Sequence, residues 1–370
     1  MKKIIMTAKH LDAGGVETFI TGIYPYIDKE KYSIDFLITK KEDENDPKGY
    51  FEDELVSQGA KVFRISSKSS NMIRAYRDLK TFFTEHKEYD IFHINDGGGA
   101  AFPLYVANKF SKCKFIVHSH NADSKKWKQN IVMTLFRGYV KSKAYCIGCS
   151  NKAAEWMFGR NSDYAILHYG IDTAKFKYNQ TARETIRKQY AIKDNEYVIG
   201  NVGRFNVQKN HSFMIDIFHE YHTRDVNSKL MLIGSGELEQ DIRKKINDYG
   251  LRDAVIFVGN TKQVEQYLSA MDLFLFPSLF EGLPIVQIEA QANGVPCLIS
   301  DTITDEIRIT DLVKTKSITL PASEWADDIE KIKTADRGNR SAYAQFVRDG
   351  GFDRQNTAKR IMDIYEEILK

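Results

Sequence analysis

The sequence predicts an α/β protein made of two doubly wound, Rossmann-like domains. Short apolar segments recur along the whole chain, and helix-length segments with apolar residues on one face separate them. Apolar strands that alternate with amphipathic helices are typical of parallel sheets covered on both faces. The length of 370 residues points the same way, because it exceeds one ordinary core and suits two domains.

The predicted strands fall into two series. The first series is 3–8, 33–38, 61–65, 89–94, 114–119, 144–149 and 164–169, and the second is 197–202, 229–234, 254–259, 272–277, 296–301 and 316–320. They part near 168–176, so we expect one domain over 1–170, a second over 171–350 and a closing helix over 351–370. Ligands of such folds bind outside the carboxyl ends of the strands, which predicts a cleft between the domains.

Composition excludes several classes of protein. The chain is 42% hydrophobic and 28% charged, as in soluble globular proteins. No apolar run approaches the roughly 18 residues of a membrane span, and the apolar start 4–8 is too short for a signal peptide, so we expect a cytoplasmic protein. Cys146 and Cys149 form a CxxC within a predicted strand. We interpret them as buried strand residues rather than as a redox or zinc motif.

The segment 276–301, FPSLFEGLPIVQIEAQANGVPCLISD, contains the strongest functional signal. Glu281 and Glu289 stand eight positions apart around a predicted helix start. Gly282 lets the backbone approach a ligand, and Pro284 suits the first helical position. The free N–H groups of such a start favour a phosphate. The alternative is an ordinary helix between two buried strands, with a solvated glutamate at each end.

This segment resembles the signature of the retaining nucleotide-sugar glycosyltransferases of the GT-B fold, family 4, which is Glu-x7-Glu within an EGLPIVQIEA-like run. The resemblance continues in GGVETF (14–19), VHSHN (117–121) and GNVGRFNVQKNH (200–211). It implies an acceptor-side N-terminal domain, a nucleotide-sugar-binding C-terminal domain and a final helix that crosses back. It also implies retention of anomeric configuration, no cofactor and no obligate metal.

Two loops after predicted strands offer phosphate ligands. Arg204 and Lys209 lie five positions apart, so both can reach one diphosphate; the alternative is a pair of surface cations. Gly14 and Gly15 let a loop pass close to a ligand, unless they form only a structural turn. The segment 234–239, GSGELE, lacks the third glycine of a dinucleotide fingerprint. The resemblance implies that it flanks the nucleotide.

The pair His118 and His120 ends a predicted strand. A metal site would need a third ligand, and the sequence does not identify one. The resemblance places His120 beside the transferred sugar and His118 further back. The glycine-rich segment 93–101 follows another strand and is a candidate for the acceptor side.

Positive charge gathers in the N-terminal half. Segment 109–143 holds nine lysines and arginines against one acid, Asp123, mixed with apolar residues such as Leu135 and Phe136. This pattern could dock on an anionic membrane; the alternative is a solvated basic helix. No nucleic-acid-binding motif accompanies it. The polar run 40–49 is expected to be a surface loop.

We therefore expect a glycosyltransferase that moves a hexosyl group from a nucleotide diphosphate, preferably UDP, to a hydroxyl of a saccharide or lipid-linked saccharide in cell-surface polysaccharide synthesis. The expected donor-binding residues are Gly14, Gly15, Arg204, Lys209, Gly282, Leu283, Pro284 and Glu289, and the expected catalytic residues are His120 and Glu281. Two alternatives remain: an epimerase of the same fold, which needs no acceptor, and a nucleotide-sugar binder without turnover.

Overall fold

The computed structural model describes residues 1–12, 15–39, 48–95, 98–120, 127–281, 283–335 and 338–370, with the backbone alone for 127–133. The chain divides into two compact units. Unit 1 comprises Met1–Gly170 and Arg354–Lys370, and unit 2 comprises Ile171–Asp353. Most of the predicted loop 40–49 lies outside the described residues.

The described part of unit 1 contains a seven-stranded parallel sheet in the order β3-β2-β1-β4-β5-β6-β7. Its strands are β1 (Lys2–Ala8), β2 (Tyr32–Ile38), β3 (Val62–Arg64), β4 (Ile91–Ile94), β5 (Lys114–Ser119), β6 (Tyr145–Gly148) and β7 (Ala165–Ile166). The central strands are buried on both faces, which explains why their sequences are apolar without alternation.

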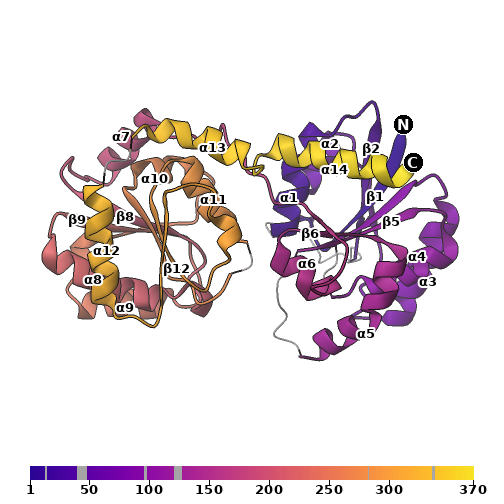
Figure 1. Cartoon of the computed structure of the whole chain (residues 1–370), viewed down its shortest axis with the longest axis horizontal. Coiled ribbons are helices and arrows are strands. Elements are labelled where there is room, and N and C mark those ends of the chain that lie inside the picture. Colours follow the sequence, from indigo (N-terminus) through magenta and orange to yellow (C-terminus); the bar gives the residue numbers. More distant parts are fainter. Residues whose placement is uncertain (13–14, 40–47, 96–97, 121–126, 282, 336–337) are drawn as a thin grey trace. The chain divides into compact units, whose positions relative to one another are not determined.

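Helices cover both faces of this sheet. They are α1 (Gly15–Ile23), α2 (Glu52–Ser57), α3 (Met72–Glu85), α4 (Ala101–Phe110), α5 (Trp127–Lys143), α6 (Asn151–Phe158) and α14 (Arg354–Leu369). Residues of α3, α4, α5 and α6 share one core with the sheet, whereas α14, the yellow C-terminal helix, packs against α1 (Figure 1). Asn71 and Ser150 cap α3 and α6 by accepting from the N–H groups of Arg74 and Ala153.

The described part of unit 2 contains a six-stranded parallel sheet in the order β10-β9-β8-β11-β12-β13. Its strands are β8 (Tyr197–Val202), β9 (Ser228–Ile233), β10 (Val255–Gly259), β11 (Leu273–Phe276), β12 (Cys297–Ser300) and β13 (Val313–Lys316). The first and last residues of unit 2, Ile171 and Asp353, lie next to each other, because they form a β-bridge.

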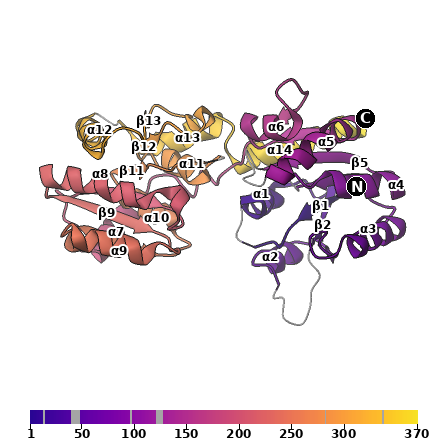
Figure 2. The same ribbon diagram turned by 90° about the horizontal axis from the view of Figure 1, so that it is seen from below.

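Alternate residues of these strands enter two separate cores. Ile199 and Leu275 pack with the first set of helices, whereas Val198 and Phe274 pack with the second. The first set is α8 (His211–Arg224), α9 (Glu239–Asp248) and α12 (Ala322–Thr334); the second is α7 (Gln180–Gln189), α10 (Val264–Ala270), α11 (Ile285–Ala292) and α13 (Tyr343–Asp349). Figure 2 shows these helices around the strands of the sheet.

The predicted fold class is confirmed, and two strands, 114–119 and 197–202, match to the residue. The prediction of a strand at 316–320 was wrong. The strand β13 is Val313–Lys316, pairing with β12 from Cys297↔Val313 to Ser300↔Lys316, and 318–319 form a turn. All four residues of β13 are only partly buried and two are lysines, so the strand lacks the apolar signature of its neighbours.

Both sheets reverse their strand order at one place, between β1 and β4 in unit 1 and between β8 and β11 in unit 2. At such a switch point the two connecting loops run to opposite sides and leave a crevice at the carboxyl ends of the strands. Within each unit, the residues that follow these strands are therefore the first candidates for ligand binding.

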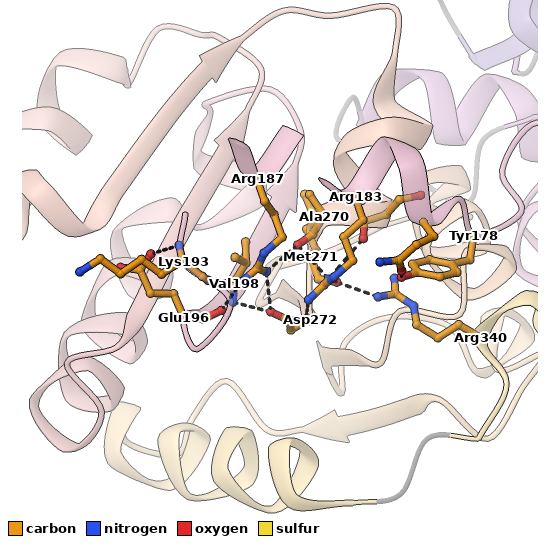
Figure 3. Close-up of polar contacts among 12 residues, drawn as sticks. Tyr178, Arg183, Arg187, Lys193, Glu196, Val198, Ala270, Met271, Asp272 and Arg340 are labelled. Atoms are coloured by element: carbon orange, nitrogen blue, oxygen red, sulfur yellow. Dashed lines mark hydrogen bonds and ion pairs between the residues drawn. The ribbon is translucent and has the colours of Figure 1, made fainter. Parts of the chain in front are cut away.

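A cluster of arginines lies at the amino ends of β8 and β11, opposite the carboxyl ends of these strands (Figure 3). Arg183 and Arg187 on α7 donate to the carboxylate of Asp272 at 2.8 and 3.2 Å, and the N–H of Val198 donates to the same group at 2.8 Å. Arg340 donates to the carbonyl of Met271 at 3.1 Å. These cations compensate the negative C-terminal end of α10, so the cluster is structural.

Candidate functional site

Three loops at the carboxyl edge of the unit 2 sheet form a pocket of about 520 Å³. The loops follow β8, β9 and β10. The N–H of Gly203 donates to Ile233, that of Phe205 to Ser235 and that of Gly234 to Gly259, at 2.9–3.0 Å. These hydrogen bonds hold the three loops together. The pocket that the loops form is lined by residues that include Gly203, Arg204, Ser235, Asn260 and Thr261.

Steric crowding explains why positions 234 and 236 are glycines. Gly234 has φ +130°, and a Cβ at this position would lie 2.1 Å from the carbonyl oxygen of Gly203. A Cβ on Gly236 would lie 2.4 Å from the carbonyl oxygen of Phe205. The two loops thus approach more closely than any side chain permits, and the glycines both hold the loops together and line the pocket.

Lys209 and Glu281 form an ion pair beside this pocket. The Lys209 Nζ lies 2.8 Å from Glu281 Oε1, and the two side chains are 16% and 8% exposed. Gln208 Nε2 donates to the other carboxylate oxygen at 3.1 Å. The ammonium also lies 4.6 Å from the centre of the Phe276 ring. The sequence identified both charged residues but not their pairing, which the fold creates between residues 72 positions apart.

The loop that carries Lys209 is fixed locally. Asn206 caps the short 3-10 helix Val207–Lys209 by accepting from the N–H of Lys209 at 3.1 Å. Asn210 adopts the left-handed conformation, with φ 55°, and donates to the carbonyl of Pro277 at 3.1 Å. A cation on such a loop loses little further conformational freedom when it binds an anion.

Arg204 differs from Lys209. Its side chain is 72% exposed, and it lies 3.2 Å from the carboxylate of Glu237, which is 55% exposed. Exposed ion pairs contribute little to stability. Arg204 lines the pocket on a flexible stem and is therefore available to a ligand at small structural cost.

The predicted anion-binding helix is α11, and its start differs by one residue from the prediction. Pro284 is the N-cap rather than the first helical residue, and no described side chain caps the helix. The N–H of Gln287 donates to the carbonyl of Pro284 at 3.0 Å, whereas the N–H groups of the two residues before it have no acceptor within the helix. The predicted end is confirmed: Gly294 follows the last turn with φ +70°. Leu283 and Glu289 are partly buried, and Gly282 lies outside the described residues.

In unit 1, His120 is held between two residues that the sequence analysis did not single out. Its Nε2 lies 2.9 Å from Asn95 Oδ1, and its Nδ1 contacts the hydroxyl of Tyr169. The Asn95 amide is oriented because its Nδ2 donates to the carbonyl of Thr7 at 3.0 Å. Asn95 therefore accepts from Nε2–H, and Nδ1 accepts from Tyr169. The tautomer follows from these contacts.

Three histidines of unit 1 stack in a row. The rings of His93 and His118 lie 5.5 Å apart, and those of His118 and His120 lie 4.0 Å apart. Burial lowers the pKa of His93 to about 3; burial and, to a smaller degree, His93 lower the pKa of His120 to about 3. Both are neutral imidazoles at physiological pH. His118 is fully buried, and neither of its nitrogens has a hydrogen-bond partner among the described residues.

The remaining candidates are placed as follows. Gly15 is the first residue of α1 and is exposed, and Gly14 lies outside the described residues. Cys146 and Cys149 are buried, as predicted. The described residues contain no group of three or more His, Cys, Asp or Glu that could hold a metal ion. Asn95, Tyr169 and Gln208 were missed because their only signal is position at a strand end or in a loop.

Comparison with known proteins defines the class. Residues 13–175 match the family described as Glycosyltransferase Family 4, and residues 182–344 match Glycosyl transferases group 1. The chain belongs to the family 4 glycosyltransferases of the GT-B fold, and it is an enzyme that transfers sugars.

Two of the compared proteins, EpsF and HepE, match this chain over nearly its whole length. EpsF of Bacillus subtilis, a protein assigned as a glycosyltransferase, is 29% identical over 98% of this chain and 96% of its own length. A galactosyltransferase of Escherichia coli, named for UDP-Gal as donor and α-D-GlcNAc-diphosphoundecaprenol as acceptor, is 23% identical over 62% of this chain and 63% of its own. HepE of Anabaena, solved with UDP, has the same fold, with a TM-score of 0.82 at 17% identity over 99% and 100% of the two chains.

No helix among the described residues is long and apolar enough to cross a membrane.

Proposed function

We propose that the enzyme transfers a hexosyl group, with retention, from a UDP-sugar to a hydroxyl of a saccharide acceptor in the synthesis of a cell-surface polysaccharide. The observation that carries this proposal is the Lys209–Glu281 pair beside the glycine-lined pocket at the carboxyl edge of the unit 2 sheet. UDP and UDP-glucose complexes of HepE support the choice of donor. The names of the E. coli relative and of the capsular glycosyltransferase CapH of Staphylococcus aureus support the pathway class.

The donor site divides into parts with different tasks. The pocket between the loops after β8, β9 and β10 takes the nucleoside. The diphosphate binds Lys209, Arg204 and the N–H groups at the start of α11, where negative charge develops as the sugar leaves. Glu289 on α11 accepts from the ribose hydroxyls. Glu281 holds Lys209 in place and reaches the sugar.

The proposed retention is supported by the neutral state of His120 and by the cations of unit 2. Since His120 is neutral and its Nδ1 and Nε2 already have partners, it acts through its orientation beside the sugar rather than as a base. A leaving diphosphate, fixed by cations, can itself accept the proton of the incoming hydroxyl on the same face of the sugar. That step forms the new glycosidic bond, breaks the sugar–phosphate bond and leaves the proton on the diphosphate.

Calorimetric titration with UDP, GDP and ADP tests the base, and the corresponding sugars then test the donor. Saturation with UDP at 100 times its Kd should raise the free energy of unfolding by about 2.7 kcal/mol. The anomeric configuration of the product, followed by NMR, tests retention. Absence of binding to all three nucleotides would refute the donor site, and an inverted product would refute retention alone.

The role of Glu289 has its own test. Glu289→Gln should weaken UDP binding but leave the affinity for 2′,3′-dideoxy-UDP close to that of the wild type, because that nucleotide lacks the hydroxyls that Glu289 contacts. Gln keeps the shape of the side chain and removes its charge. Equal loss of affinity for both nucleotides would assign Glu289 to packing instead.

We also propose that unit 1 docks on an anionic membrane surface through α5. Leu135 and Phe136 are 74% and 49% exposed, and Lys141 and Lys143 at the end of the same helix are exposed. Apolar residues next to cations are typical of interfacial helices. The lysines 125, 126 and 128 of the predicted patch lie outside the described side chains. The double variant Leu135→Ser/Phe136→Ser should lose pelleting with anionic vesicles at low salt, and equal pelleting of variant and wild type would contradict the proposal.

A further inference from the structure

Gln208 connects two loops of unit 2 that follow neighbouring strands. The loop after β8 carries Gln208, and the loop after β11 carries residues 279–281. The carbonyl of Gln208 accepts from the N–H of Leu279 at 2.9 Å, and its side-chain Nε2 donates to the carbonyl of Phe280 at 3.0 Å. One residue therefore holds the two backbone positions that immediately precede Glu281.

The same side-chain amide also reaches the carboxylate of Glu281. A glutamine amide has two N–H donors, and Gln208 Nε2 lies 3.1 Å from Glu281 Oε2 in addition to its contact with the Phe280 carbonyl. Lys209 Nζ lies 2.8 Å from the other carboxylate oxygen, Oε1. Two consecutive residues of the neighbouring loop thus supply one donor to each oxygen of Glu281.

These two contacts fix the plane of the carboxylate. The terminal torsion of a glutamate is broad when nothing holds it, whereas a donor on each oxygen restricts its rotation. A carboxylate has about four lone-pair sites, so each oxygen keeps one site for a ligand after these contacts are made. Gln208 thereby decides where the remaining lone pairs of Glu281 point, while both of its own N–H donors are used within the protein.

Two observations distinguish this contact from a general fastening of the loops. The loops remain tied without the Gln208 side chain, because the backbone bond from Leu279 persists and Asn210 Nδ2 donates to the carbonyl of Pro277 at 3.1 Å. In addition, Gln208 is not among the residues that line the pocket between the loops after β8, β9 and β10. Its amide therefore serves the carboxylate of Glu281 and not the nucleoside.

We propose that Gln208 is a positioning residue for transfer, which orients the carboxylate of Glu281 toward the sugar in the step that breaks the sugar–phosphate bond. It sets the rate of this step and leaves the affinity for the nucleotide unchanged. This inference rests on the proposed function, because the contact of Glu281 with the sugar is part of that proposal.

Hydrolysis of the donor measures this step without an acceptor. Water then replaces the acceptor hydroxyl: the sugar–phosphate bond breaks, the hydroxyl of water goes to the sugar, and the proton goes to UDP or to the buffer. UDP release is followed with UDP-glucose, UDP-galactose and UDP-N-acetylglucosamine, and the variants are compared on the donor that the wild type hydrolyses fastest. Calorimetric titration with UDP measures the nucleotide affinity separately.

The variant Gln208→Met removes the amide and keeps most of the side chain's length. It should lower kcat by about tenfold, since a hydrogen bond to a charged group is lost, and it should keep the Kd for UDP within about twofold of the wild type. Gln345→Met is the matched control, because Gln345 on α13 also donates to a carboxylate, that of Asp349, at 2.7 Å. The control should keep both the kcat and the Kd.

The variant Gln208→Glu gives a readout that a merely structural role would not move. Two adjacent carboxylates share a proton, which raises the pKa of the pair, and the protonated carboxyl group replaces the lost amide donor. The ratio of variant to wild-type kcat should therefore rise as the pH falls from about 8 to about 5. Lys209, which faces Glu281, limits this rise. His211 stays neutral in this range, since burial and, to a smaller degree, Lys209 lower its pKa to about 4.

Three results overturn the inference. They are a wild-type kcat in Gln208→Met, a loss of UDP affinity in that variant as large as its loss of kcat, and a ratio for Gln208→Glu that does not change with pH. The proposed function is tested separately by the wild type: failure to bind UDP refutes that function, whereas any of the three results with intact UDP binding by the wild type refutes only the role of Gln208.

Discussion

Replacing Lys209 by methionine tests the ammonium and keeps most of the side chain's length. It removes the group that binds Glu281 at 2.8 Å and lies 4.6 Å from the centre of the Phe276 ring. A charge-assisted hydrogen bond contributes about 1.5–3 kcal/mol, which corresponds to roughly 10- to 150-fold in affinity. The variant also leaves a carboxylate, 8% exposed, facing the diphosphate without its cation. We therefore expect UDP binding to weaken at least tenfold.

The same change tests the structural half of the pair. Losing one partner of a largely buried ion pair leaves a charge uncompensated, so the midpoint of thermal unfolding should fall in Lys209→Met. Gln208 still donates to Glu281, which limits the loss. In the double variant Lys209→Met/Glu281→Gln both charges are gone. Its melting temperature should return toward that of the wild type while UDP affinity stays low.

Isothermal titration with UDP and thermal unfolding without ligand measure the two effects. Arg204→Ala is the control, because Arg204 is largely exposed and its removal should weaken UDP binding without lowering the melting temperature. If Lys209→Met binds UDP within twofold of the wild type, Lys209 serves only as the partner of Glu281, and the diphosphate lies elsewhere.

Three further predictions concern the scaffold. Gly234→Ala should weaken UDP binding at least tenfold in calorimetry, since its Cβ would meet a carbonyl oxygen of the neighbouring loop at 2.1 Å; Gly250→Ala, also at positive φ but with nothing within 4 Å, should not. Asp272→Asn should lower the free energy of unfolding, measured in urea, by about 3 kcal/mol and leave UDP affinity unchanged, because the charge of the buried Arg187 loses its partner. An unchanged midpoint of urea unfolding would contradict this. His93, with a pKa lowered by burial to about 3, stays neutral when folded, whereas the unfolded chain takes up a proton below pH 6.5. Stability should thus fall from pH 6.5 toward pH 3, by about 2 kcal/mol at pH 5 for this group, and His93→Gln should show a smaller fall between urea melts at pH 7 and pH 5.

The sequence alone determined the fold class, and it predicted the charged residues of the proposed donor site. Strands buried on both faces must be apolar throughout, so they stand out from amphipathic helices without knowledge of their neighbours. Likewise Arg204, Lys209 and Glu281 lie in loops, and Glu289 lies inside the helix that follows, where nearby glycines and prolines mark the segment locally. The position of strand β13 was predicted wrongly, because its four residues are only partly buried and do not form such an apolar pattern.

Tertiary structure decided which of these residues meet. The pairing of Lys209 with Glu281 joins the ends of β8 and β11, and the contacts of His120 with Asn95 and Tyr169 join residues 25 and 49 positions apart. Such contacts depend on strand order, which reverses at the switch point of each sheet and leaves no local trace in the chain. The burial of Glu17, which is 9% exposed in the first turn of α1, is of the same kind. Its type is visible in the sequence, but its burial is set by side chains that several strands and helices bring together.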